Sequence, residues 1–127
     1  MPVRSPSPAR SEDGRARRDR GRRAEWLALL ALSLRGYRPV ARNLRTPVGE
    51  IDLVVRRGGT LAIVEVKTRG QLADAAEALR PGHQARIRRA AEFLLARRPD
   101  LAALTIRFDV MLVLPRRWPR HLVGVVS

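Results

Sequence analysis

Three charged residues lie inside two stretches of the chain that otherwise read as buried β-strands. Asp52 lies in the first stretch, residues 50–55, and both Glu65 and Lys67 lie in the second, residues 60–68. Burying a charged side chain is costly unless it is paired or binds a metal ion. Charged residues in apolar strands therefore indicate a functional site.

The spacing of these residues favours a divalent metal site between the two strands. The 12 residues that separate Asp52 from Glu65 suit a hairpin turning at residues 57–59, which would bring the two carboxylates together. Both would ligate the cation, with the backbone carbonyl of Val66 as a third oxygen ligand and water completing the shell. Oxygen ligands of this kind favour Mg²⁺ or Mn²⁺.

Lys67 completes a constellation that can hydrolyse phosphodiesters. Its ammonium group would help to activate a metal-bound water and would offset charge on a pentacovalent transition state. Lys67 is also the only lysine among 26 basic residues, so chance alone would place it at this position one time in 26. Because a guanidinium is planar and always charged, we interpret the lone lysine as a chemical requirement, with an accidental lysine as the alternative.

The composition narrows the classes of function. A chain of 127 residues suits one domain. The absence of cysteine excludes disulfides and thiolate metal sites, and only two histidines do not favour a histidine-based zinc site. No stretch has the length and apolar character of a signal peptide or a membrane span, so we expect a cytoplasmic protein without an integral membrane segment.

The net charge of +14 is spread along the chain. Residues 1–23 hold eight arginines and three acids, which leaves 18 basic and 9 acidic residues, a net charge of +9, for the remainder. Such a chain should attract polyanions, and we expect nucleic acid as the partner, with DNA favoured. The alternatives are an anionic membrane surface, ribosomal RNA, or a GC-biased genome that places arginine wherever a basic residue is tolerated.

The elements that must position the site can be predicted from hydrophobic periodicity. Residues 22–35 are rich in Leu and Ala and predict a helix that ends at Gly36. The other predicted elements are strands at residues 37–44, 50–55, 60–68, 104–114 and 121–126, and a second helix at residues 83–97. This α-β-β-β-α-β-β order predicts an α/β fold, a mixed sheet flanked by helices. Residues 1–20 predict a disordered basic arm before a single domain spanning residues 21–127.

The alternation of side chains along each strand assigns them to faces. In the first site strand, one face should carry Ile51, Leu53 and Val55, and the other Glu50, Asp52 and Val54. In the second, one face should carry Leu61, Ile63, Glu65 and Lys67. The carboxylate and the ammonium of this second strand are therefore expected to project from the same side.

Four other ionisable residues have two readings each. Glu25 shares a helix stripe with core leucines, either as part of the site or as a first-turn acid that the helix dipole favours. Glu50 is either adjacent to the site or a salt-bridge partner of a neighbouring arginine. For Asp109 we favour a surface or edge-strand acid over a supporting role at the site, and for His121 a structural role.

Four short motifs, in order along the chain, carry a resemblance to a known family. The segments GRRAEWLALLALSLRGYRPVARN, GEIDLVV, VEVKTR and RFDVMLV resemble the YraN family of small bacterial proteins, which is similar to archaeal Holliday-junction resolvases. Asp52 followed by Glu65-Val66-Lys67, with Glu25 on a preceding helix, looks like the PD-(D/E)xK nuclease superfamily. The resemblance covers residues 21–121 and implies a restriction-endonuclease-like fold.

The resemblance also implies roles for individual residues. It implies that Asp52 and Glu65 are metal ligands, that Lys67 is the catalytic lysine and that Glu25 is an auxiliary acid. The chain departs from the pattern at three positions, where a Pro, a Gly and a basic residue are expected, respectively: Ile51, Ala24 and His83. Nucleic-acid contacts are expected from three further residues: Arg69, Gln84 and Arg86.

Three hypotheses for function follow. The first is a metal-dependent endonuclease or phosphodiesterase that acts on structured or branched DNA, as a homodimer presenting two sites. The second is a non-catalytic module that binds DNA or RNA on a nuclease fold. The third is association with the ribosome or a membrane surface through the basic arm.

Overall fold

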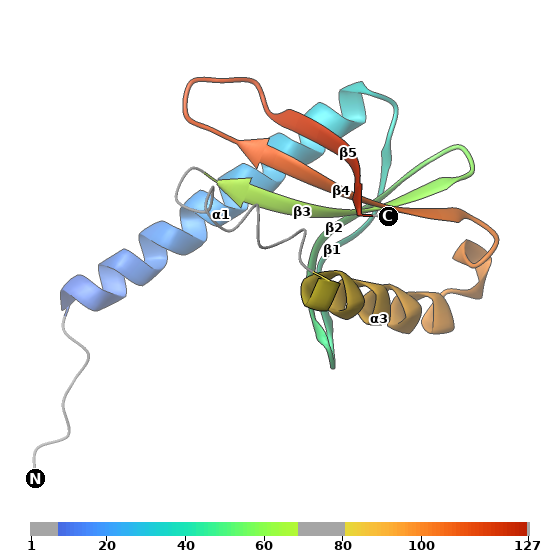
Figure 1. The fold of residues 1–127 in the computed structure, drawn as a ribbon. Coiled ribbons are helices and arrows are strands. Elements are labelled where there is room, and N and C mark those ends of the chain that lie inside the picture. Colours follow the sequence, from blue (N-terminus) through green and yellow to red (C-terminus); the bar gives the residue numbers. More distant parts are fainter. Residues whose placement is uncertain (1–7, 69–80, 127) are drawn as a thin grey trace, which may run out of the picture.

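The computed structural model describes residues 8–68 and 81–126, which form a five-stranded sheet and two long helices (Figure 1). The elements in chain order are α1 (Pro8–Leu34), β1 (Arg38–Thr46), β2 (Gly49–Arg57), β3 (Thr60–Thr68), α3 (Pro81–Arg97), the 3-10 turn η2 (Pro99–Leu101), β4 (Thr105–Val113) and β5 (Arg120–Val126). The predicted α-β-β-β-α-β-β order is confirmed.

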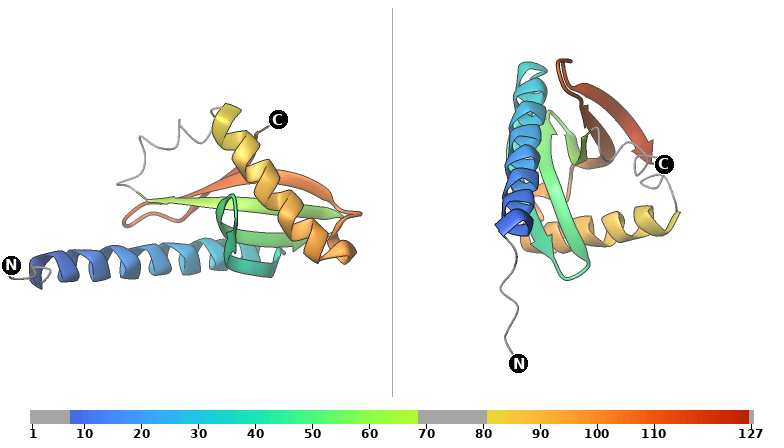
Figure 2. Two further views of the ribbon diagram at one scale, coloured as in Figure 1. Left: turned by 90° about the horizontal axis from the view of Figure 1, so that it is seen from below. Right: turned by 90° about the vertical axis from the view of Figure 1, so that its left-hand side faces the viewer.

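The sheet is mixed, and its strands lie in the order β1-β2-β3-β4-β5. Neighbouring strands are antiparallel except β3 and β4, which are parallel. A parallel pair needs a long crossover, and α3 lies in that connection. Figure 2 shows α1 and α3 on opposite sides of the sheet, which confirms the predicted α/β arrangement.

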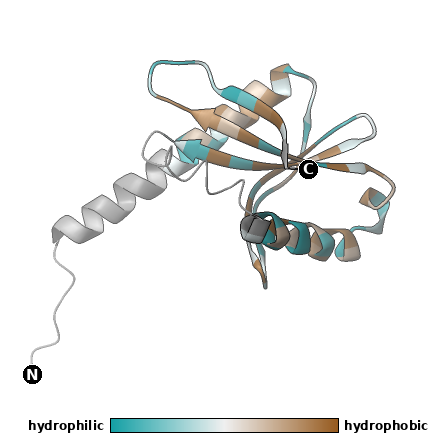
Figure 3. Ribbon diagram, in the orientation of Figure 1, coloured by the Kyte–Doolittle hydropathy of each residue, from teal (hydrophilic) through white to brown (hydrophobic). Residues whose placement is uncertain are grey.

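A separate hydrophobic core lies on each face of the sheet, consistent with the apolar character of the strands in Figure 3. On one face, Ala28 and Leu32 of α1 pack with strand residues such as Leu53 and Val64. On the other face, Ala91 and Leu94 of α3 belong to a second core, which also includes the strand residues Val54, Leu61 and Ile63. Strands covered on both faces explain why β3 reads as a nearly continuous apolar run.

Helix α1 is longer than the sequence predicts. It begins at Pro8 instead of Arg22, so that residues 8–20, which the sequence assigned to a disordered arm, are helical. Proline suits the first turn of a helix, and the arginines and alanines that follow are good helix formers. Residues 1–7 lie outside the described residues.

The end of α1 at Gly36 is as predicted. The Tyr37 amide donates to the Leu32 carbonyl at 3.1 Å, and the Gly36 amide donates to the Ser33 carbonyl at 3.0 Å. Gly36 has a φ of 90°. This pair of bonds around a residue with positive φ is a Schellman motif, and it turns the chain so that Tyr37 is buried in the same core as Leu32.

One predicted face is wrong. Ile51 belongs to the core beneath α3, together with Val54, and not to the core of Leu53 and Val55. The ladder between β2 and β3 ends at the pair Leu53 and Val64, and before Leu53 the strand pairs only with β1. A two-stranded ribbon twists more strongly than a full sheet, which rotates Ile51 away from the regular alternation.

No helix among the described residues is both long enough and apolar enough to span a membrane.

Candidate functional site

The predicted site residues come from three elements that meet where β2 leaves β3. Asp52 is on β2, one residue beyond the last pair of the β2–β3 ladder, and Glu65 and Lys67 are on β3. Glu25 is on α1, where it is half-buried beside Ala24, a core residue. Beyond the end of the ladder, the backbone amides and carbonyls on the β2 side of β3 need hydrogen-bond partners other than a strand.

The Asp52 carboxylate takes the place of the missing strand. Its Oδ2 accepts a hydrogen bond of 2.9 Å from the backbone amide of Val66. In a β-strand the amide and the carbonyl of one residue point to the same side, so the Val66 carbonyl faces this edge as well. The carbonyl that the sequence predicted as a metal ligand is therefore directed toward the Asp52 side of β3.

Glu65 and Lys67 project from the same face of β3, as the alternation predicted. The Lys67 Nζ lies 2.9 Å from Oε1 of Glu65, and the two side chains are only 12% and 21% exposed, respectively. The same face carries Leu61 and Ile63 further back along the strand. A partly buried ion pair thus lies next to the separation of the two strands.

The Asp52 carboxyl has a strongly perturbed proton affinity. Its pKa is raised from 3.8 to about 6, chiefly by burial, while the hydrogen bond from the Val66 amide acts in the opposite direction. The charges of Glu25 and Glu65 contribute to this rise, whereas that of Lys67 opposes it. All four ionisable groups therefore lie close enough to interact, and their combined charge at neutral pH favours an added cation.

The donors at this point fit a hard divalent cation. The described residues hold no group of three or more His, Cys, Asp or Glu side chains arranged for a metal ion, so a complete side-chain cage is absent there. The remaining donors are the carboxylates of Asp52 and Glu65 and the carbonyl of Val66, all of which would bind a metal ion through oxygen. Mg²⁺ is commonly held by one or two carboxylates and several waters, so this donor set suits it.

The residues predicted to contact nucleic acid are only partly placed. Gln84 is half-buried and Arg86 is exposed, both in the first turns of α3. The Arg86 side chain passes close to Gly49 at the start of β2, where a β-carbon would lie 3.7 Å from its Cδ. Arg69 lies outside the described residues, as does the side chain of His83. Glu50, on β2, is exposed and is the register partner of Arg45 on β1.

The expectation that Asp109 is a surface or edge acid is wrong. β4 lies between β3 and β5, and Asp109 is 2% exposed. Its Oδ1 and Oδ2 accept hydrogen bonds of 2.9 and 2.8 Å from the Arg107 guanidinium, and Oδ1 also accepts one from the Gly124 amide. Oδ2 lies 2.7 Å from Nε2 of His121. This network agrees with the structural role predicted for His121.

The network around Asp109 reaches the end of α1. Nδ1 of His121 lies 3.0 Å from the Arg35 guanidinium, which can only donate, so the histidine proton belongs on Nε2. Arg107 also donates to the Tyr37 hydroxyl. Burial raises the pKa of Asp109, but the bonds from His121, Arg107 and Gly124 outweigh it and lower the pKa to about 2. An Arg-x-Asp pattern within a predicted strand was the only sequence signal for this pairing.

The fold and the site define a class of protein: a mixed α/β domain with a half-buried carboxylate, an ion pair and a helix acid gathered where two strands separate. The chain belongs to the family described as "Uncharacterised protein family UPF0102", which it matches over residues 24–113. This is the YraN family, so the resemblance that the motifs predicted is confirmed.

Curated relatives are similar over most of their length. A "UPF0102 protein" from Parvibaculum lavamentivorans is 65% identical over 102 residues, which cover 80% of this chain and 77% of the relative. One from Chelativorans sp. is 51% identical over 108 residues, covering 85% and 87%. One from Methylobacterium nodulans is 52% identical over 120 residues, covering 91% and 93%.

Proposed function

We propose that this protein is a metal-dependent endonuclease or phosphodiesterase that acts on structured or branched DNA. The observation that carries the proposal is the Asp52 carboxylate bonded to the open edge of β3, with Glu25, Glu65 and Lys67 near enough to change its pKa. Buried groups with perturbed pKa values gather at functional sites more often than elsewhere. Their types and order match the pattern on which the PD-(D/E)xK resemblance rests.

Each residue has a distinct task in this proposal. Asp52, Glu65 and the Val66 carbonyl would hold Mg²⁺ or Mn²⁺, which when bound supplies a Lewis acid and a water of lowered pKa. Lys67 would turn its ammonium from Glu65 toward the attacked phosphate and offset the charge that develops there. Glu25 would accept a proton or a hydrogen bond from water on the α1 side of the site.

The choice of a nucleic acid as substrate rests on charge. The chain carries 26 basic and 12 acidic residues, and neutralising phosphates is the main sequence-independent source of affinity for nucleic acid. A half-buried site between a sheet and a helix is reached more easily by a flexible or branched strand than by a regular duplex. Junctions and flaps are therefore the first substrates to test.

The test is cleavage of a panel of labelled duplex, single-stranded, flap and four-way DNA and RNA substrates, with Mg²⁺, Mn²⁺ or chelator. We expect metal-dependent cleavage that falls by at least about 10²-fold in Asp52→Asn, Glu65→Gln and Lys67→Ala. Glu50→Gln removes an exposed acid two residues from Asp52 and should cleave at the wild-type rate. Loss of cleavage in all four variants, or cleavage unaffected by Lys67→Ala, contradicts the proposal.

A non-catalytic nucleic-acid-binding module is the second candidate, and one observation favours it. The 2.9 Å pair of Lys67 and Glu65 already neutralises both groups, as a purely structural ion pair would. This candidate predicts salt-sensitive binding that is indifferent to Mg²⁺ and to Lys67→Ala, with no cleavage of any substrate in the panel. Binding measured by fluorescence anisotropy on the same variants separates the two candidates.

A further inference from the structure

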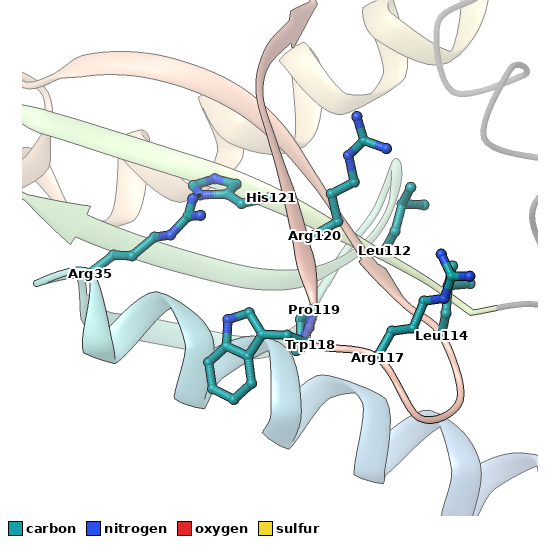
Figure 4. Close-up of a pocket in the computed structure, with 8 residues that line it drawn as sticks. All are labelled: Arg35, Leu112, Leu114, Arg117, Trp118, Pro119, Arg120 and His121. Atoms are coloured by element: carbon teal, nitrogen blue, oxygen red, sulfur yellow. Dashed lines mark hydrogen bonds between the residues drawn. The ribbon is translucent and has the colours of Figure 1, made fainter.

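A second feature of the molecule is a pocket beside the turn that joins β4 to β5. It has a volume of about 390 Å³, within the range of small-ligand sites. We call it the turn pocket and define it by four lining residues: Arg35, Arg117, Trp118 and Arg120. In Figure 4, Arg35 reaches from the end of α1 toward His121, the Trp118 ring lies beside α1, and Arg120 points to the other side of β5.

The turn pocket is positively charged and has no acid among the described residues that line it. Its three guanidinium groups stay charged at every accessible pH. The carboxylate bonded to the lining residue His121 is that of Asp109, which is buried and is also bonded to Arg107 and Gly124. The pocket therefore presents uncompensated positive charge, which suits an anionic ligand.

The ring of Trp118 adds a platform for stacking. It is 59% exposed, and no aromatic or guanidinium group of the described residues stacks on it. The other tryptophan, Trp26, is equally exposed at 58%, but the Arg42 guanidinium lies over its ring at 4.1 Å. An exposed indole among arginines is the combination that binds a nucleotide, with the base on the ring and the phosphate on the guanidinium groups.

The turn pocket adjoins the candidate site across the sheet. Lys67 on β3 is the register partner of Leu112 on β4, and Leu112 is the register partner of Arg120 on β5. Register partners on neighbouring strands share a face, so Arg120 leaves the sheet on the face of Lys67, two strand spacings or about 10 Å away. Adjacent residues of a strand point to opposite faces, so His121 and its partner Arg35 lie on the α1 side, and the turn pocket faces the Lys67 side only through Arg120.

We propose that the turn pocket binds an unpaired nucleotide of a single-stranded nucleic acid. Trp118 stacks on its base, while Arg35, Arg117 and Arg120 contact its phosphate and those of neighbouring nucleotides. An unpaired nucleotide is specified because both faces of a base inside a duplex are covered by its neighbours. The inference rests on the proposed function only in taking nucleic acid as the ligand, and it requires no cleavage.

The test is binding of a fluorescein-labelled single-stranded DNA of about 10 nucleotides, a common site size for such surfaces, in buffer with chelator. We expect Trp118→Ala to weaken binding about 10-fold, because stacking of one base has roughly this effect. Trp26→Ala, the matched control with equal exposure, should stay within about two-fold of wild type. Equal effects of the two variants, or no effect of Trp118→Ala, overturn the proposal.

A second measurement keeps the test independent of the stability of Trp118→Ala. In Trp26→Phe the only tryptophan is Trp118, and its emission should be quenched by the single-stranded DNA and much less by a blunt duplex. Unchanged emission at saturating single-stranded DNA overturns the proposal. So does quenching by anionic lipid vesicles alone, or by thymidine monophosphate at the concentration that suffices for the oligonucleotide. Because chelator is present throughout, a protein without nuclease activity can still give the expected result.

Discussion

Two aspartates of this protein, the buried Asp109 and the half-buried Asp52, have pKa values shifted in opposite directions, and their hydrogen bonds explain the difference. Asp109 interacts with two charged or polar side chains and one backbone amide, which lower its pKa to about 2. Asp52 accepts one bond, from the Val66 amide, and faces two other acids, so burial raises its pKa to about 6. Asp109 is a satisfied structural group, whereas Asp52 is held in an environment that opposes its charge.

This environment predicts how stability depends on pH. The folded Asp52 keeps its proton up to about pH 6, whereas in the unfolded chain it loses it near pH 3.8. The folded state therefore binds more protons between these values, and the free energy of unfolding falls as pH rises from about 4 to 6, by about 3 kcal/mol in total. Above pH 6 the cost is fully present.

Asp52→Asn should remove this cost, because an amide oxygen can still accept the Val66 bond without carrying a charge. We expect the variant to be more stable than wild type by about 1 to 3 kcal/mol at pH 8, and close to wild type at pH 4. Urea unfolding at the two pH values in chelator measures the difference. A variant that is less stable than wild type at pH 8 would show that Asp52 is a stabilising ion-pair member.

At the scale of elements, the turn after α1 decides where the Asp109 network and the turn pocket meet the helix. Gly36 holds its φ of 90° between Arg35, which lines the pocket, and Tyr37, which bonds Arg107. A β-carbon at this position would meet only the Arg57 side chain at 3.7 Å, an ordinary contact. The cost of any side chain here is therefore conformational.

Gly36→Ala is expected to lower the free energy of unfolding by about 1 to 2 kcal/mol, through the left-handed backbone alone. Gly59→Ala provides a control, because that glycine has no positive φ and nothing lies within 4 Å of the place that an added β-carbon would occupy. Thermal or urea unfolding of both variants measures the effect. Equal stability of the two would contradict the assigned role of the Schellman turn.

The elements that the sequence predicted best are those whose apolar residues follow a regular pattern. The bounds of β3 coincide with the prediction, because Leu61 to Val64 is apolar on both faces and Gly58-Gly59 and Thr68 delimit the strand. The shared face of Glu65 and Lys67 follows from the same alternation. The face of Ile51 could not be predicted in this way, because it depends on where β2 stops pairing with β3, which is a property of the whole sheet.

Long-range partners explain the other differences. Asp109 read as a surface acid because its partners are Arg107, two residues away, and His121 and Gly124, which come from the next strand. Nothing in the local sequence shows that β5 folds back over it. Conversely, the candidate site could be predicted in good part, since Asp52, Glu65 and Lys67 lie on two consecutive strands joined by a tight turn. The turn pocket combines residues of α1 and the β4–β5 turn, and the sequence gives no sign of their proximity.

At the scale of the whole molecule, positive charge extends from the N-terminal segment to the domain. Residues 1–20 carry six arginines and three acids, so their deletion leaves a net charge of +11. Among the residues whose burial the structure describes, the first core residue of α1 is Ala24, so the deletion retains the described packing of the helix on the sheet. Most of the attraction for nucleic acid should remain with the domain.

We expect deletion of residues 1–20 to weaken binding to DNA and to make its salt dependence less steep, while binding remains measurable. Each phosphate contact contributes about 0.9 to the slope of log K against log salt for duplex DNA, so losing up to six arginines changes the slope by at most about 5. Anisotropy titrations at several salt concentrations give both slopes. Complete loss of binding would instead assign the interaction to the N-terminal segment.

The partly buried pair of Lys67 and Glu65 has a practical consequence for anyone studying this protein in solution. The other 25 of the 26 lysine and arginine residues are arginines, so Lys67 carries the only side-chain amine that an amine-directed reagent can modify. Reductive methylation with a carbon-13 label would place one side-chain NMR reporter within 2.9 Å of a proposed metal ligand. The candidate site can thus be observed by spectroscopy without introducing a mutation.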